Sequence, residues 1–208
     1  MALVRRVRPR MAGMVVVVSL LGVSCAGSGA TYVTSRSTGT FLKVPDGWKV
    51  FKQDEIRSRV DTGGSPPYPF LAAFDADPRP SLAHTFSDAR YPWGLVRVRD
   101  LGLAEHDAFS LASLRNEVVH VDDLEQSDPS AVQVLSPPKL VTHRGLRGTR
   151  LEYSVHADGT EFTVVQAGYV DEATHRVWLL ILGCDTSCFH RNSTAIHRVA
   201  DSWIVQGR

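Results

Sequence analysis

The stretch that decides the fold spans residues 150–182 and reads RLEYSVHADGTEFTVVQAGYVDEATHRVWLLIL. Apolar and polar residues alternate over 150–156, which is the pattern of a strand with one buried and one solvated face. The later runs, 162–170 and 177–182, are largely apolar on both faces and are therefore expected at the centre of a sheet. An Ala-Asp-Gly segment and a polar five-residue segment separate the three runs, which predicts an antiparallel meander with short turns.

After this stretch, the chain closes with a predicted helix that Asp185 or Ser187 can cap. Its apolar residues recur along one stripe, and they are Phe189, Ile196, Val199, Ala200 and Trp203. Such a stripe has to be buried against the sheet. The fold class is therefore α+β: an antiparallel β-sheet meander covered by helices, with the C-terminal helix packed on the sheet.

Before residue 150 the pattern predicts shorter elements. The expected strands are 40–44, 48–52, 70–74, 95–99, 132–135 and 139–143. Asp107 is expected to cap a helix with Phe109 and Val118 on its apolar side, and the acidic segment 122–129 is expected to be a loop. All of these elements fit one globular domain, residues 40–206, since about 180 residues suffice for one core.

The N-terminal segment has the features of a signal peptide. Residues 1–10 contain four arginines and no acidic residue, and residues 11–23 form an uncharged apolar run. The apolar core of a signal peptide is about 7–15 residues long, whereas a membrane-spanning helix needs about 20. We therefore expect residues 1–24 to be a signal peptide that is removed on export.

The apolar run ends in Leu21-Gly-Val-Ser-Cys25, which resembles the lipobox of bacterial lipoproteins. Members of that family carry a diacylglycerol on the cysteine and are cleaved before it, although Gly22 stands where they usually have leucine. The resemblance implies that Cys25 is the lipid attachment site and that the protein is held on the extracytoplasmic face of the cell membrane. The alternative is an ordinary signal peptide cut after Ala30, which leaves a secreted protein.

Residues 25–39 are small and polar, so they are expected to be a flexible tether between the lipid and the domain. Removing residues 1–24 leaves 19 of the 23 basic residues against 22 acidic residues, a formal charge of about −3. This balance argues against nucleic acid or a polybasic membrane contact. The membrane is expected to be reached through the lipid alone, and an envelope protein is the expected partner.

Three cysteines occur, and lipid on Cys25 leaves Cys184 and Cys188 as a pair. Exported thiols tend to oxidise, so the pair is predicted to be a disulfide that fixes a local bend. Together with His190 the two cysteines could instead hold zinc. A structural zinc site needs four ligands, however, and export favours the disulfide.

Other segments contain residues that could form a catalytic or metal site, but each is expected to have a structural or solvent-exposed role instead. Asp61-Thr62-Gly63 spells the aspartic-protease tripeptide, but a proline-rich segment follows it and a surface turn is expected. His190 and His197 lie two helical turns apart, too far to chelate one metal, and are expected on a solvated face. The acidic residues Asp122, Asp123, Glu125 and Asp128 match no calcium-loop spacing and are expected to be solvated. We therefore predict no catalytic residue, no metal site and no cofactor.

The four tryptophans are Trp48, Trp93, Trp178 and Trp203. Trp48 and Trp203 could line a pocket beside the sheet, because tryptophan favours recognition surfaces. A place in the core is the usual role of such residues.

Three segments resemble domains with the PsbP/Mog1-like fold, in particular small lipoproteins of actinobacteria. They are FLKVPDGWKV at 41–50, GLRGTRLEYSV at 145–155, and the closing Ser-Trp-Ile-Val at 202–205. The resemblance covers roughly residues 36–206. It implies an antiparallel sheet between helices and a binding role rather than catalysis.

PsbP-like proteins dock on membrane photosystems and Mog1-like proteins bind a small GTPase, partners that do not suit an exported bacterial protein. No functional residue is therefore carried over to this chain. The expected function is that of a non-enzymatic binding or scaffold domain of the cell envelope. Two alternatives remain: a carrier or sensor for a small apolar ligand, and an exported hydrolase whose site assembles only in space.

Overall fold

The computed structural model describes residues 29–58, 68–85, 90–143, 145–157 and 159–207. The strands in these ranges are β1 (Ala30–Ser35), β2 (Thr40–Pro45), β3 (Lys49–Lys52), β4 (Phe70–Asp75), β5 (Trp93–Asp100), β6 (Val132–His143), β7 (Leu146–Ala157), β8 (Thr160–Asp171), β9 (Arg176–Asp185) and β10 (Ile204–Val205). The helices are α1 (Gln53–Arg57), α2 (Leu103–His106), α3 (Leu111–Arg115), α4 (Val121–Ser127) and α5 (Thr186–Asp201), with a 3-10 turn at Leu82–His84.

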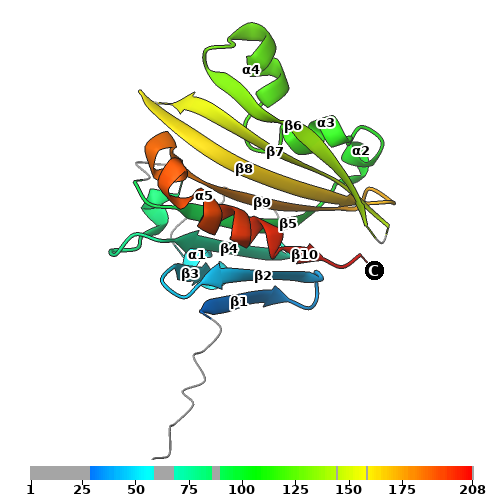
Figure 1. Ribbon diagram of the computed structural model, residues 1–208. Coiled ribbons are helices and arrows are strands. Elements are labelled where there is room, and N and C mark those ends of the chain that lie inside the picture. Colours follow the sequence, from blue (N-terminus) through cyan, green and yellow to red (C-terminus); the bar gives the residue numbers. More distant parts are fainter. Residues whose placement is uncertain (1–28, 59–67, 86–89, 144, 158, 208) are drawn as a thin grey trace, which may run out of the picture.

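The strands form two antiparallel sheets (Figure 1). The large sheet has seven strands in the order β3-β4-β5-β9-β8-β7-β6, and the small sheet has the order β1-β2-β10. β7 to β9 are the meander predicted from the deciding stretch, and β9 then pairs with β5, far earlier in the chain. The central strand β9 is buried along almost its whole length, as its apolar run predicts.

Helices cover both faces of the large sheet. Gln166 of β8 donates a hydrogen bond to the carbonyl oxygen of Leu114 in α3, 2.8 Å away. Tyr169 lies three positions later and therefore on the opposite face, where its ring packs 5.2 Å from the ring of Trp203, just after α5. The α+β class, with the C-terminal helix packed on the sheet, is confirmed.

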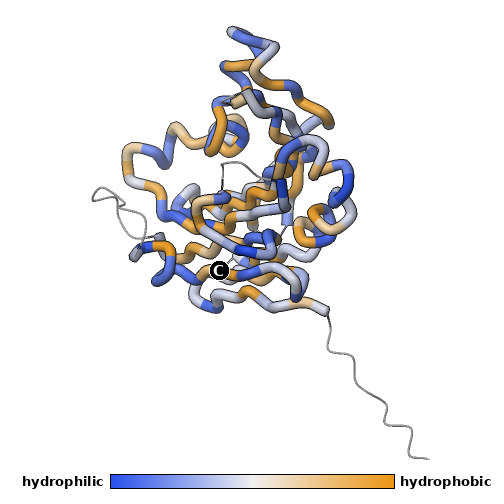
Figure 2. Tube along the Cα trace, turned by 90° about the vertical axis from the view of Figure 1, so that its left-hand side faces the viewer, coloured by the Kyte–Doolittle hydropathy of each residue, from blue (hydrophilic) through white to orange (hydrophobic). Residues whose placement is uncertain are grey.

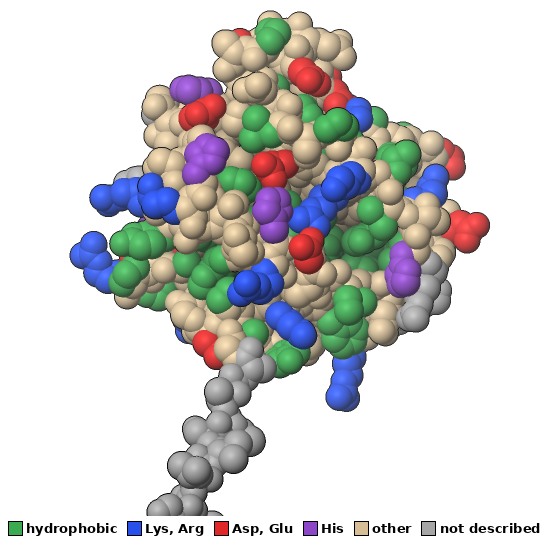
Figure 3. All heavy atoms as spheres, in the orientation of Figure 1, with side chains coloured by type: hydrophobic (Ala, Val, Ile, Leu, Met, Phe, Trp, Pro, Cys, Tyr) green, Lys and Arg blue, Asp and Glu red, His purple; other side chains and the backbone are tan. Residues whose placement is uncertain are grey.

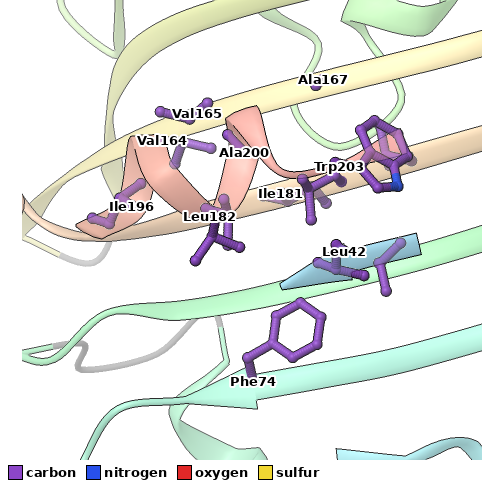
Figure 4. Close-up of a cluster of buried hydrophobic side chains, with 14 of the residues drawn as sticks. Leu42, Phe74, Val164, Val165, Ala167, Ile181, Leu182, Ile196, Ala200 and Trp203 are labelled. Carbon is purple, nitrogen blue, oxygen red and sulfur yellow. The ribbon is translucent and has the colours of Figure 1, made fainter. Parts of the chain in front are cut away.

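The C-terminal helix α5 is held by its cap and by its apolar stripe. The carboxylate of Asp185 accepts the backbone N–H of Cys188 at 2.7 Å, which satisfies one free donor of the first turn. The predicted stripe faces the sheet, and Ile196, Val199 and Trp203 are at most 6% exposed. Figure 4 shows Ile196 and Trp203 in one buried cluster with Leu42 from the small sheet and Phe74 from the large one.

The small sheet closes the α5 side of the molecule. Its backbone meets the end of α5 where the N–H of Lys43 donates to Oγ of Ser202 at 2.9 Å. The turn between β1 and β2 contains Gly39 at φ +64°, and a Cβ there would collide with the backbone oxygen of Gln206. Only glycine fits this left-handed position at such close approach.

Part of the predicted tether is wrong. Residues 25–39 were expected to be flexible, but β1 pairs with β2 from Ala30↔Pro45 to Ser35↔Thr40. Val33 and Thr38 are buried at 7% and 3% exposure. The prediction failed because a polar edge strand gives little apolar periodicity, and its pairing with β2 supplies the order that its sequence lacks.

Three other parts of the chain differ from their sequence-based predictions. The helix expected from Asp107 is replaced by α2 and α3, because Ser110 accepts the N–H of Ser113 at 3.2 Å and starts a new helix. The acidic segment expected to be a loop is largely the helix α4. The two expected strands around Ser136 are one strand, β6, with register shifts next to its prolines. Among the described residues, no helix is long and apolar enough to cross a membrane.

Candidate functional site

A hollow of about 330 Å³ lies on the α5 side of the large sheet, beside β6 and β7. Six polar residues line it, and we call it the charged groove: Ser136 and Lys139 of β6, Arg150 and Glu152 of β7, and His197 and Asp201 of α5. Figure 3 shows histidine, acidic and basic side chains gathered near the middle of this face.

The regular geometry of two elements brings these side chains together. Arg150 and Glu152 are two positions apart on β7 and therefore point to the same face of the sheet. Lys139 pairs with Arg150 across the β6–β7 ladder. His197 and Asp201 are four positions apart on α5 and share one side of the helix.

A chain of contacts runs through the groove. The guanidinium of Arg150 donates to Oδ1 of Asp201 at 2.5 Å and contacts Nδ1 of His197 at 3.2 Å. Nε2 of His197 lies 3.2 Å from Oε2 of Glu152. Because a guanidinium can only donate, Nδ1 of His197 has to accept. His197 therefore contacts a basic side chain through one ring nitrogen and an acidic side chain through the other.

The charges of this network stay accessible to solvent. The side chains of Arg150 and Glu152 are 28% and 24% exposed, and that of Asp201 is 65% exposed. Ion pairs this exposed contribute about 0–1 kcal/mol each to stability. The network therefore does little to hold the fold, but it keeps four side chains in fixed positions where a ligand can reach them.

His197 corrects one sequence-based expectation. Both histidines of α5 were expected on a solvated face, and His190 is indeed exposed. His197 instead contacts two strand residues and packs edge-on against Phe189, 6.0 Å between ring centroids. The signal that was missed is the His197/Asp201 spacing on one helix side together with the Arg150/Glu152 spacing on one strand face.

The structure brings Cys184 and Cys188 together where β9 meets α5. Their sulfurs are 2.08 Å apart and their Cα atoms 5.9 Å apart, within the range that a disulfide spans. Both side chains are fully buried. Cys25 and the Asp61-Thr62-Gly63 tripeptide lie outside the described residues.

The acidic run is spread along α4. Asp122 accepts hydrogen bonds from Arg115 and Asn116, whereas Asp123 has a side chain that is 76% exposed. Within the ranges that the structure describes, no three His, Cys, Asp or Glu side chains cluster in a way that could hold a metal ion.

The tryptophans lie mainly in the core. Trp93, Trp178 and Trp203 are at most 6% exposed, while Trp48 is only partly buried and packs against the same core. Trp203 therefore belongs to the core and does not line a pocket with Trp48.

A second hollow, of about 410 Å³, lies between the small sheet and the edge of the large one. We call it the apolar hollow; its apolar lining includes Val33 of β1, Val50 of β3, and Phe70 and Ala72 of β4. Lys52 and Asp54 add charge to its lining. No local sequence pattern predicts this hollow, because it lies between two sheets whose strands are far apart in the chain.

A buried carboxylate outside both hollows holds a histidine. Asp75 is 1% exposed and accepts the backbone N–H groups of Asp77 and Ser81. Its Oδ2 lies 2.8 Å from Nδ1 of His84. A carboxylate orients the imidazole of catalytic triads in this way. Among the described residues, no hydroxyl group hydrogen-bonds the other ring nitrogen, so the arrangement is a dyad that shapes the loop after β4.

Comparison with known proteins finds the fold and no family. No family description and no curated protein matches the chain. Among solved structures, cyanobacterial PsbP (CyanoP) from Synechocystis sp. PCC 6803 is similar, with a TM-score of 0.51 and 15% sequence identity over 88% of this chain and 97% of that chain.

Two further structures have lower TM-scores. LpqN of Mycobacterium tuberculosis, a protein involved in cell envelope biogenesis, has a TM-score of 0.49 and 15% identity, over 86% of this chain and 91% of that chain. The Ran-binding protein Mog1p of Saccharomyces cerevisiae has a TM-score of 0.47 and 10% identity, over 85% of this chain and 95% of that chain.

The likeness to CyanoP and the antiparallel sheet define the class of the fold: the chain forms an α+β domain with a PsbP-like fold. This confirms the fold that the resemblance implied. At such low identity the likeness establishes the fold alone, since one fold serves many functions. The link to actinobacterial lipoproteins stays a prediction.

Proposed function

We propose that this protein is exported, attached through lipid on Cys25 to the outer face of the cell membrane, and binds an envelope protein at the charged groove without turning over a substrate. The observation that carries the binding role is the accessible network of Arg150, His197 and Glu152, in which each side chain is oriented by the next. Oriented groups bind with a smaller loss of side-chain entropy.

The chemistry of the charged groove favours a polypeptide partner. Lys139 and Arg150 contribute two positive charges, Glu152 and Asp201 contribute two negative charges, and the imidazole of His197 lies against Arg150 and Glu152. A partner of one sign would meet repulsion as well as attraction. A peptide segment that carries both signs can match the groove, and mismatched charges would exclude other partners.

Two observations support export. The basic n-region and short apolar run of residues 1–24 are typical of a signal peptide. The buried Cys184–Cys188 pair has the geometry of a disulfide, which persists in oxidising compartments.

The binding role is tested by cross-linking in intact cells followed by a pull-down. Arg150→Ala and Glu152→Ala should each lose the cross-linked partner, while their melting temperatures should stay within a few degrees of wild type because the lost ion pairs are exposed. Arg198→Ala, on the exposed side of the same helix, is the matched control and should retain the partner. Retention of the partner by Arg150→Ala and Glu152→Ala would refute the charged groove as the binding site.

The anchor is tested separately. Cys25→Ala should move the protein out of the membrane fraction and leave it uncleaved or cut elsewhere. Recovery of the unmutated protein only from the medium, with its N-terminus at Thr31, would contradict lipid attachment.

The non-enzymatic part of the proposal has its own test. Hydrolytic activity of the purified protein that disappears in His84→Ala, with the melting temperature retained, would overturn it and assign catalysis to the Asp75–His84 dyad.

The apolar hollow favours a second candidate function, that of a carrier for a small apolar ligand. Its volume lies within the range of small-molecule sites, and Phe70, Val50 and Val33 would contact the ligand. Extracted envelope lipids should displace an apolar fluorescent probe from the protein, and Val50→Phe should weaken probe binding by narrowing the hollow. Equal probe binding by Val50→Phe and wild type would reject the hollow as the site.

A further inference from the structure

The small sheet has one buried and one open face. Val33, Leu42, Val44 and Val205 point into the core. On the other face, the ladder sets Ile204 beside Phe41 and Lys43 beside Tyr32. We call these four residues the outer face of the small sheet.

This outer face is apolar for an open surface. The side chains of Tyr32 and Ile204 are 59% and 51% exposed. The ammonium of Lys43 lies 5.6 Å from the ring centroid of Tyr32, so it shields one ring face while remaining exposed itself. Single exposed apolar residues are ordinary on protein surfaces. Here Tyr32 of β1 and Ile204 of β10 lie on either side of β2, whose partly exposed Phe41 lies on the same face, and such a grouping marks an interaction surface.

Chain length restricts what this face can meet. Only five residue steps separate Cys25 from Ala30, the first residue of β1. A fully extended chain spans at most about 3.6 Å per residue, so the Cα of Ala30 lies no more than roughly 18 Å from the Cα of Cys25. That reach is short of the width of a domain of about 180 residues, whose radius of gyration is about 16 Å. The domain therefore cannot turn freely on its anchor.

We infer that the outer face of the small sheet rests on the membrane surface. This inference depends on the proposed lipid attachment at Cys25. Figures 1 and 2 agree that the small sheet lies at one end of the molecule and α4 at the other, so contact through the small sheet points α4 away from the lipid.

The chemistry of the face suits the headgroup region of a bilayer. Tyrosine favours this region because its ring is apolar and its hydroxyl is wet. Lysine extends its ammonium toward phosphates while its methylene groups stay on apolar surface. Lys43 and the exposed Arg36 of the β1–β2 turn also attract anionic lipids.

The test measures orientation rather than retention, because two acyl chains hold the protein whatever its orientation. Ile204→Cys and Leu140→Cys each add one thiol for an environment-sensitive NBD label. Leu140 is the matched control: it is 74% exposed and lies on β6, the far edge of the large sheet. The lipidated protein, purified from membranes, is placed in vesicles of anionic and zwitterionic lipids with or without a doxyl-labelled lipid quencher.

The label at position 204 should be quenched at least twofold by the doxyl lipid and shifted to shorter emission wavelength, and the label at position 140 should be unaffected. Equal emission at both positions, with the protein floating with the vesicles, would overturn the orientation but leave the anchor intact. Failure of the unlabelled protein to float would refute the anchor itself. A concentration-dependent shift at 204 without quenching would assign the face to a second copy of the chain and reject the membrane.

Discussion

The indole Nε1 of Trp178 donates a hydrogen bond to the carbonyl oxygen of Thr38, which is 2.7 Å away in space and 140 positions earlier in the chain. This hydrogen bond joins β9, at the centre of the large sheet, to the turn between β1 and β2 of the small sheet. Thr38 is only 3% exposed, so water cannot easily replace the tryptophan as a donor. Leaving a buried carbonyl without a hydrogen-bond donor lowers the free energy of unfolding by about 1–3 kcal/mol.

Trp178→Phe should therefore lower the free energy of unfolding by about 1–3 kcal/mol, measured by urea denaturation. Trp203→Phe is the control, because Nε1 of Trp203 has no hydrogen-bond partner among the described residues and the substitution removes no such bond. Equal losses in the two variants would show that ring size, and not the bond to Thr38, decides the cost.

Trp203→Ala should cost about 3–5 kcal/mol, because it empties a buried site beside Tyr169 at the end of α5. Ile204→Ala, at the next but exposed position, should cost far less. Thermal and urea unfolding of both variants measure the difference. An unchanged melting temperature for Trp203→Ala would mean that Trp203 is not part of the core.

Because Cys184 and Cys188 form a bridge, neither should react as a free thiol before reduction. Because its loop is short, reduction should lower the free energy of unfolding by only about 2 kcal/mol. Thiol labelling before and after dithiothreitol, followed by urea denaturation, measures both quantities. Two reactive thiols in the unreduced protein, or loss of fold on chelation of a metal, would disprove the bridge.

The cap of α5 predicts a pH dependence. Burial alone would raise the pKa of Asp185, but the hydrogen bonds from the backbone of Cys188 and from Ser187, with the charge of Arg191, hold the pKa below its ordinary value. A carboxylate whose pKa is lower in the folded state stabilises the fold above its unfolded pKa, about 4. This stability is lost as the pH falls through the lower, folded pKa.

Asp185→Ala should accordingly cost about 0.5–2 kcal/mol at pH 7. The difference from wild type should shrink as the pH falls below about 4. Asp185→Asn still caps the helix but does not titrate. The free energy of unfolding of this variant should therefore lack the pH-dependent contribution of the Asp185 carboxylate. Urea denaturation at pH 7 and pH 3 measures all three proteins. A difference between wild type and Asp185→Ala that is the same at both pH values would contradict the linkage.

The fold was predictable from sequence wherever local pattern and burial coincide. The run 177–182 is apolar on both faces because β9 is central, and the stripe of α5 repeats at helical spacing because one side of the helix is buried. β1 could not be predicted in this way. It is an exposed edge strand, and its order comes from pairing with β2 rather than from its own residues.

The candidate site was less predictable than the fold. The sequence contains Arg150 and Glu152 as the polar half of an alternating strand, and His197 and Asp201 as the polar side of a helix. Nothing in either segment indicates that the two polar surfaces face each other. The contact appears only when α5 packs across the sheet and leaves β6 and β7 open beside it.

By itself, the sequence determined the kind of elements, the burial of their apolar faces and the pairing of two close cysteines. These depend on residues that are near each other in the chain, where periodicity and spacing carry the information. Tertiary structure alone decided which strands are neighbours, that residues 30–35 complete a second sheet, and that His197 meets Arg150, 47 positions earlier. Such contacts follow from how whole surfaces fit together, and that fit has no local signature in the chain.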